Sequence, residues 1–101
     1  MFELTGKSAL VTGASGGIGG AIATALHASG ASVALSGTRI EPLEALRDAL
    51  GDRAHVTPAD LGAADGAAQL AKDAEAALGQ IDILVNNAGL TRDGLAMRMK
   101  E

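Results

Sequence analysis

Three glycines, Gly13, Gly17 and Gly19, follow a short apolar segment with the spacing Gly-x-x-x-Gly-x-Gly. Glycine permits a tight turn and lets the backbone approach a bound group without a Cβ in the way. A helix that starts at such a turn offers free N–H groups and a partial positive charge to an anion. The pattern therefore predicts a site for the pyrophosphate of a dinucleotide. The alternative is a turn whose glycines only allow tight strand–helix packing, and a P-loop is excluded because no Gly-Lys-Ser/Thr follows.

A second candidate position is the end of the next apolar segment, where Ser36, Gly37, Thr38 and Arg39 follow one another. In a dinucleotide site, an acidic residue at this tip holds a free ribose 2′-hydroxyl, whereas a nearby arginine accommodates a 2′-phosphate. The tip holds Arg39 and no acid, so it favours NADP(H) over NAD(H). The alternative is that Arg39 is an ordinary solvated loop arginine.

Polar residues also follow the two later apolar segments. The Asp60 carboxylate could accept a hydrogen bond from an adenine amino group, and Leu61 could cover the adenine ring. The alternative is that Asp60 is a helix N-cap. The amides of Asn86 and Asn87 could bridge neighbouring strand ends, while Ala88 and Gly89 leave room for a flat group. The alternative for this second motif is a plain turn.

The elements that position these residues alternate along the chain. Strands are expected over residues 8–12, 31–36, 54–58 and 81–86, and helices within residues 13–30 and over residues 42–50 and 65–78. Helix faces are expected at Ile18, Ile22, Ala25 and Leu26, at Leu43, Leu46 and Leu50, and at Leu70, Ala74, Ala77 and Leu78. Gly30, Gly51 and Gly79 are the expected terminators, and Pro42 is expected at a first helical position. This alternation predicts an α/β, Rossmann-like parallel sheet of about four strands with helices on both faces.

Composition narrows the function classes. The chain has 101 residues, 48% of them hydrophobic, and a formal charge of −4, which indicates one small globular domain and argues against a nucleic-acid surface. It has no cysteine and no tyrosine, so it offers neither a thiolate nor a phenol for catalysis. No signal peptide or membrane span is expected, and a reducing, cytoplasmic setting fits best. His27 and His55 lack partners at ligand spacing, so no metal site and no catalytic base are expected.

The last eleven residues begin an amphipathic pattern at Leu95, Met97 and Met99, which predicts a terminal helix. Its apolar residues could pack in the core, line a substrate entrance or form a subunit contact. Without further strands beyond it, the fourth strand, IDILV, would be an exposed apolar edge of the sheet, where copies of the chain could associate. We therefore expect residues 1–101 to be the N-terminal, dinucleotide-binding half of a longer doubly wound domain. Self-association through that edge or the terminal helix is expected.

The motifs TGASGGIG (residues 12–19), Asp60-Leu61 and NNAG (residues 86–89) together resemble the classical short-chain dehydrogenases/reductases. The resemblance covers essentially the whole chain. The segments GKSALVTGASGGIG and IDILVNNAGLTRDGLAMRMK are most similar to the bacterial 3-oxoacyl-[acyl-carrier-protein] reductases of that family.

The resemblance implies a nicotinamide dinucleotide as partner and hydride transfer from NADPH to a 3-keto thioester of acyl-carrier protein or CoA. It also implies that Thr12 and the region of Asn86 brace the central strands. The positions that the family's motifs assign to cofactor binding are Gly13, Ala14, Ser15, Gly16, Gly17, Ile18, Gly19, Thr38, Arg39, Asp60, Leu61, Asn87, Ala88 and Gly89.

The sequence departs from the family pattern at two points. NADP-dependent members often carry a basic residue where this chain has Gly16, a contact on the order of 1–3 kcal/mol. The family's catalytic Ser, Tyr and Lys lie beyond NNAG, and nothing in these 101 residues replaces them. We therefore expect no catalytic residue in this chain.

Two alternatives to part of a 3-oxoacyl-[acyl-carrier-protein] reductase stay open. They are a non-catalytic nucleotide-binding or self-associating fragment, or a family member acting on acetoacetyl-CoA, a sugar or a polyol. A methyltransferase is disfavoured by NNAG and by the missing acid after the second strand.

Overall fold

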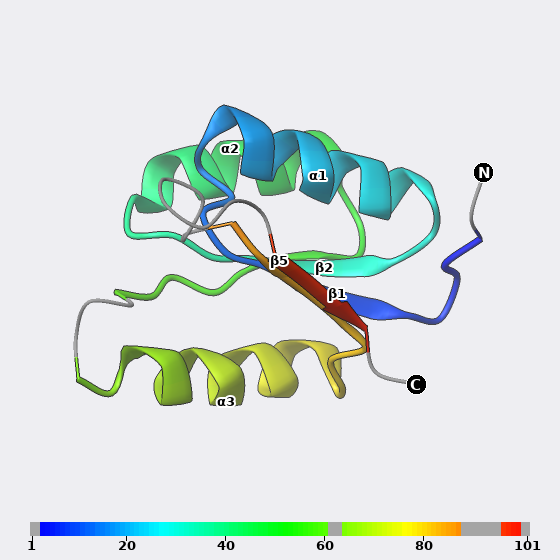
Figure 1. Ribbon diagram of the computed structural model, residues 1–101. Helices are drawn as coiled ribbons and strands as arrows, with labels where there is room; N and C mark the ends of the chain where they lie inside the picture. The colour runs from blue at the N-terminus through cyan, green and yellow to red at the C-terminus, as the bar shows by residue number, and fades with distance from the viewer. Residues whose placement is uncertain (1–2, 61–63, 88–95, 100–101) are drawn as a thin grey trace.

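The computed structural model describes residues 3–60, 64–87 and 96–99. Its elements are β1 (Ser8–Val11), α1 (Gly17–Ala28), β2 (Ser32–Leu35), α2 (Ile40–Leu50), β3 (Ala54–Val56), α3 (Gly66–Leu78), β4 (Ile83–Asn86) and β5 (Ala96–Met99). They form one sheet in the order β3-β2-β1-β4-β5. The first four strands are parallel, so the predicted Rossmann-like α/β sheet with helices on both faces is confirmed (Figure 1).

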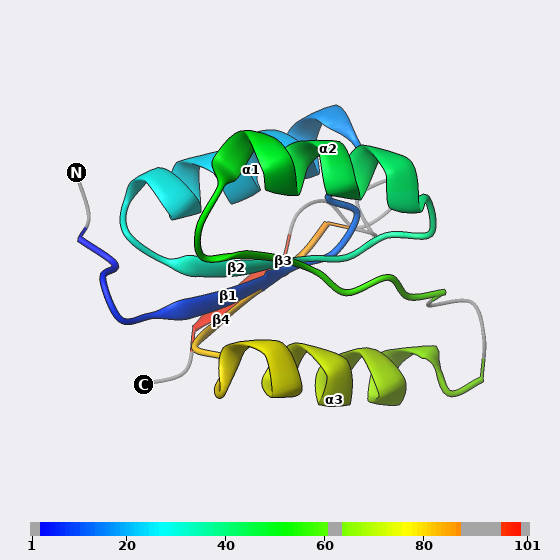
Figure 2. The ribbon, with the colours of Figure 1, turned by 180° about the vertical axis from the view of Figure 1, so that it is seen from behind.

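The sheet separates two apolar layers. The side chains of Val11, Val33, Leu35 and Val85 point to one face, where they pack against Leu43 and its neighbours under α1 and α2. On the other face, Leu10 and Ala34 pack against Leu70 and Ala74 of α3. We call these the α1/α2 face and the α3 face, and the view from behind shows the same division (Figure 2). Strands buried on both faces explain the continuous apolar runs in the sequence.

The predicted helix ends agree with the structure. Gly51 and Gly79 follow α2 and α3 with φ of 82° and 84°, and Gly30 follows α1 with φ of 107°. Glycine adopts this left-handed conformation without a Cβ penalty, which explains why each helix ends there.

Four details of the helix predictions were wrong. Ala25 is exposed, because it lies almost opposite the buried Ala23 on α1. Helix α2 begins at Ile40, so Pro42 is its third residue and not its first. The first four N–H groups of a helix have no partner within the helix, so proline is still tolerated at this position. Ile18 is 54% exposed rather than on the core face, because it lies in the first turn of α1, beyond the edge of the core. Ala77 is exposed, although helical spacing places it on the same side of α3 as the buried Leu70 and Ala74.

The prediction of a terminal helix was also wrong for residues 96–99. This segment is β5, which pairs antiparallel with β4, Ile83 opposite Met99. A short helix nucleates poorly, whereas the edge of β4 offers a row of backbone donors and acceptors. The edge strand is therefore β5, so pairing of two copies through the edge of β4 loses its basis. Leu95 lies outside the described residues.

Candidate functional site

The turn between β1 and α1 presents the start of a helix at the carboxyl edge of the sheet. Gly13 has φ of 64°, and its carbonyl accepts a hydrogen bond from the Gly16 N–H at 3.2 Å. Gly16 is the N-cap of α1 without a side-chain cap, and the first turn of α1 contains no acidic residue. A Cβ on Gly17 would meet no atom of the described residues within 4 Å. The turn therefore combines free N–H groups, an uncompensated positive helix end and open space, which suits an anion.

Gly19 and Asn87 fix the shape of this turn. A Cβ on Gly19 would lie 2.2 Å from the Gly13 carbonyl oxygen and 2.8 Å from Asn87 Nδ2. The Asn87 amide donates from Nδ2 to the same Gly13 oxygen at 3.2 Å. Asn87 is buried, and its Oδ1 accepts no hydrogen bond from the described residues. The end of β4 thus holds the glycine turn in place, and only glycine fits at position 19.

Thr12 joins the ends of β1 and β4, as the resemblance implies. Its N–H donates to the Val85 carbonyl at 3.0 Å. Its hydroxyl lies 3.3 Å from both the Val85 oxygen and Asn86 Oδ1. Thr12 is buried, so these bonds fix the spacing of the two strand ends from which the turn and NNAG start.

The tip of β2 lies next to the turn. The Ser36 carbonyl oxygen accepts a hydrogen bond from the Ala14 N–H at 2.9 Å, and this bond joins the tip of β2 to the β1–α1 turn. Ser15 packs so closely on Gly37 that a Cβ at position 37 would lie 3.2 Å from Ser15 Oγ. The sequence analysis missed this role of Gly37, because the contact depends on how two loops pack against each other.

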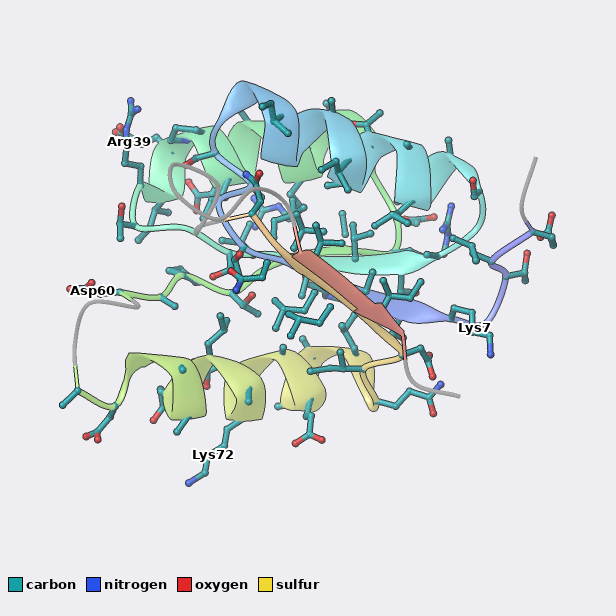
Figure 3. The ribbon with its side chains drawn as sticks, viewed as in Figure 1. Lys7, Arg39, Asp60 and Lys72 are labelled. Atoms are coloured by element: carbon teal, nitrogen blue, oxygen red, sulfur yellow. The ribbon has the colours of Figure 1, made fainter. Side chains whose placement is uncertain are left out.

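Thr38 and Arg39 follow this tip and are exposed. Arg39 is the N-cap of α2 without a side-chain cap, so its guanidinium lies near a second positive helix end. Figure 3 shows Arg39 and Asp60 projecting on the same side of the molecule, with Lys7 at the opposite end. Glu41 in the first turn of α2 is the nearest acid along the chain.

A cavity of about 360 Å³ lies between the ends of β2 and β3. Its lining residues are Gly37, Thr38, Pro58, Ala59 and Asp60. The Ala59 N–H donates to the Gly37 carbonyl at 3.1 Å, which sets the width of this opening. A second cavity, of about 330 Å³, shares Asp60 and continues toward Asp65 at the start of α3.

The structure brings most of the predicted site residues together along one edge. The N-cap alternative for Asp60 was wrong, because Asp65 is the N-cap of α3. Leu61, Ala88 and Gly89 lie outside the described residues. Sequence reasoning missed Pro58 and Ala59 as lining residues, although aligning the ends of β2 and β3 would have found them.

His27 has a structural contact, since its Nε2 lies 2.6 Å from the Asp52 carbonyl oxygen. Within the described residues, no three His, Cys, Asp or Glu side chains gather as a metal ion would need. In that same part of the chain, no helix is both long enough and apolar enough to cross a membrane.

Comparison with known proteins identifies the family. The sequence profile described as short chain dehydrogenase matches residues 7–101. The chain belongs to the short-chain dehydrogenase family. The full chain is 60% identical to nodulation protein G of Rhizobium sp. (strain N33), of which it covers 41%. It is also 45% identical, over 95% of its length, to 3-oxoacyl-[acyl-carrier-protein] reductase FabG of Escherichia coli (strain K12), of which it covers 39%.

Solved structures of longer proteins contain the same fold. A hydroxysteroid dehydrogenase from Escherichia coli matches 83% of this chain with a TM-score of 0.79 and 36% identity, and the match covers 36% of that protein. A dehydrogenase/reductase from Sinorhizobium meliloti 1021 matches 83% of the chain with a TM-score of 0.78 and 42% identity. The chain thus spans about two fifths of the length of its curated relatives.

Proposed function

We propose that this chain is the NADP(H)-binding, N-terminal half of a ketoacyl reductase-like oxidoreductase. The observation that carries the proposal is the continuous edge from the glycine turn, past the tip of β2, to the cavity beside Asp60. A dinucleotide needs a pyrophosphate site and an adenosine site side by side at the carboxyl ends of parallel strands. When bound, the nicotinamide would supply the hydride for reduction of a keto group.

The turn is the proposed pyrophosphate site. The open space at Gly17 and the uncapped start of α1 fit a diphosphate, which the backbone N–H groups would bind without a side chain between them. Asn87 acts indirectly on this site, because its Nδ2 donates a hydrogen bond to the Gly13 carbonyl that shapes the turn. Its buried Oδ1 is a further acceptor beside the turn.

The preference for NADP(H) rests on the tip of β2. Arg39, Thr38 and the uncapped start of α2 together offer a cation, a hydroxyl and free N–H groups to a 2′-phosphate. No acid stands at positions 36–39 to accept from a free 2′-hydroxyl. Asp60 at the cavity wall is the proposed acceptor for the adenine amino group, and Leu61 is the residue proposed to cover the ring.

The substrate of the whole enzyme is proposed as a 3-ketoacyl thioester of acyl-carrier protein or CoA, reduced in the cytoplasm. The support is the similarity to the 3-oxoacyl-[acyl-carrier-protein] reductases. The 101 residues contain no tyrosine and no cysteine, so the proton donor for such a reduction is expected from outside them. By itself, this chain is expected to bind cofactor and not to turn it over.

Calorimetric titration with NADPH, NADH and adenosine 2′,5′-bisphosphate tests the proposal. We expect NADPH to bind more tightly than NADH, and the bisphosphate to retain part of the affinity because it occupies only the β2–β3 side. Equal affinity for both dinucleotides would remove the NADP preference. Absence of binding by all three would refute a formed cofactor site in this chain. Oxidation of NADPH by acetoacetyl-CoA in the presence of the chain alone would refute the expected inactivity.

A further inference from the structure

Two cavities meet at the end of β3. The first, of about 360 Å³, is the proposed adenosine site, and the second, of about 330 Å³, lies between the end of β3 and the start of α3. Pro58, Ala59 and Asp60 line both of them. These three residues therefore form the boundary, and a group that bonds to Asp60 from the first cavity stands at the entrance of the second.

The second cavity offers room beyond such a group. A water molecule occupies about 30 Å³, so a volume of about 330 Å³ holds a chain of several non-hydrogen atoms. An adenine amino group has two hydrogens, and one can be replaced by such a chain while the other still donates to Asp60. The space beside Asp60 thus allows a substituent without loss of the proposed contact.

The inner wall of the second cavity is apolar. Leu70 is 3% exposed and packs against the strands, so the core fixes its position. Gly66 at the start of α3 adds no side chain to this wall, and Pro58 and Ala59 complete it. Methylene groups that contact these residues are removed from water, which favours an alkyl chain along this wall.

The polar groups at the rim of the cavity are hydrogen-bond acceptors. Asp60 and Asp65 contribute carboxylates, and both residues are exposed. Gln69 donates from Nε2 to Asp73 Oδ1 at 3.0 Å, which leaves its Oε1 as an acceptor. Among the described residues that line the cavity, none is a lysine or an arginine. A rim of this kind suits a group that has several donors and a positive charge, such as an ammonium.

The start of α3 acts against a cation, but with less charge than the two carboxylates. A helix N-terminus carries about +0.5 elementary charge, whereas two ionised carboxylates carry about −2. Lys72, the basic residue of α3, points away from the sheet (Figure 3). The net field at the rim therefore attracts a cation.

We propose that the second cavity is a subsite for a short cationic chain carried on the adenine amino group of the cofactor. The alkyl part lies along Leu70, and the ammonium lies at Asp65. The inference rests on the proposed cofactor site and extends it, because it assigns a ligand class, the N⁶-aminoalkyl derivatives of NADP(H), to space that the unsubstituted cofactor does not need.

Calorimetric titration of this chain tests the proposal with NADPH, N⁶-(2-aminoethyl)-NADPH and N⁶-propyl-NADPH, whose substituent has the same length without the charge. We expect the aminoethyl compound to bind at least as tightly as NADPH. It should bind about threefold more tightly than the propyl compound, which is the effect of an exposed ion pair. This preference should disappear in about 0.5 M NaCl, because salt screens exposed charges.

Two variants locate the ammonium. Asp65→Asn removes a carboxylate of the rim and keeps a residue that suits a helix N-cap. We expect it to abolish the preference for the aminoethyl over the propyl compound. Glu75→Gln removes the same charge from an exposed position of α3 outside the cavity, and it should keep the preference. Circular dichroism checks the fold of both variants, and the salt dependence of the unchanged chain tests the charge without any substitution.

The opposite results overturn the proposal at separate points. If NADPH binds and both derivatives bind at least tenfold more weakly, the second cavity does not adjoin the amino group, and the cofactor site itself stands. Equal binding of the two derivatives means that the carboxylates do not contact the substituent. A preference that survives Asp65→Asn places the ammonium elsewhere. Absence of NADPH binding refutes the proposed cofactor site and this subsite with it.

Discussion

At the carboxyl edge of the sheet, the β1–β4 side is held by close contacts, whereas the β2–β3 side is open. On the first side, Gly13 and Asn87 leave no room for a Cβ at position 19, and Thr12 bonds the ends of β1 and β4. On the second, Arg39 and Asp60 are exposed beside a cavity of about 360 Å³. A rigid backbone suits the pyrophosphate, which all nicotinamide dinucleotides share. Exposed side chains suit the ribose, where NAD(H) and NADP(H) differ.

The largest effect is expected at Gly19. Gly19→Ala places a methyl group 2.2 Å from a backbone carbonyl that Asn87 holds in position, so the chain cannot relax at low cost. We expect the free energy of unfolding to fall by about 3 kcal/mol, and NADPH binding to be lost. Urea unfolding followed by circular dichroism measures the change in stability, since the chain has no Trp or Tyr.

Gly20→Ala is the matched control, because its Cβ would be 3.4 Å from the nearest atom. Its free energy of unfolding should rise by about 0.5–1 kcal/mol. Wild-type stability of Gly19→Ala would show that the turn is adaptable.

On the open side, Arg39→Gln should change affinity and leave stability alone. The guanidinium is exposed at the start of α2, and a charge-assisted hydrogen bond to phosphate contributes about 1.5–3 kcal/mol. We therefore expect NADPH binding to weaken roughly 10- to 100-fold, and NADH binding to stay the same. Arg47→Gln is the control on the same helix, where Arg47 pairs with Asp48 at 3.2 Å. An equal loss for both cofactors would place Arg39 away from the 2′-phosphate.

Gly37→Asp should shift the cofactor preference toward NADH, with a smaller effect than Arg39→Gln. Its carboxylate could accept from a free ribose 2′-hydroxyl and would repel a 2′-phosphate. The new Cβ would be 3.2 Å from Ser15 Oγ, which can rotate away. We expect the NADPH-to-NADH affinity ratio to fall about tenfold in calorimetric titrations. Gly37→Asn has nearly the same size without the charge. If Asn lowered the ratio equally, crowding and not charge would determine the preference.

The same comparison explains how much the sequence could predict. The parallel sheet and the glycine turn follow from local pattern and from the alternation of strands and helices, whereas the Thr12 brace was implied by the family resemblance. The role of Gly37 against Ser15 could not be predicted, because it depends on how two loops pack. Residues 96–99 were misassigned because their pattern fits a helix, whereas the free edge of β4 decides the outcome. Asp60 was ambiguous because Asp serves equally as a cap and as an acceptor.

The smallest expected effect compares two buried threonines, one on each side of the edge. Thr12 and Thr57 are 4% and 5% exposed, so solvent satisfies neither hydroxyl. The Thr12 hydroxyl bonds to the end of β4, whereas the Thr57 hydroxyl has no partner among the described residues. Replacing a bonded hydroxyl with a methyl group loses about 0.5–1.5 kcal/mol, while replacing an unpaired one removes a desolvation cost.

Thr12→Val should therefore lower the free energy of unfolding by about 1 kcal/mol, and Thr57→Val should raise it by up to about 1 kcal/mol. Urea unfolding of both variants measures the difference. Destabilisation by Thr57→Val would mean that its hydroxyl is bonded in solution, and that the β2–β3 side is as tightly built as the other.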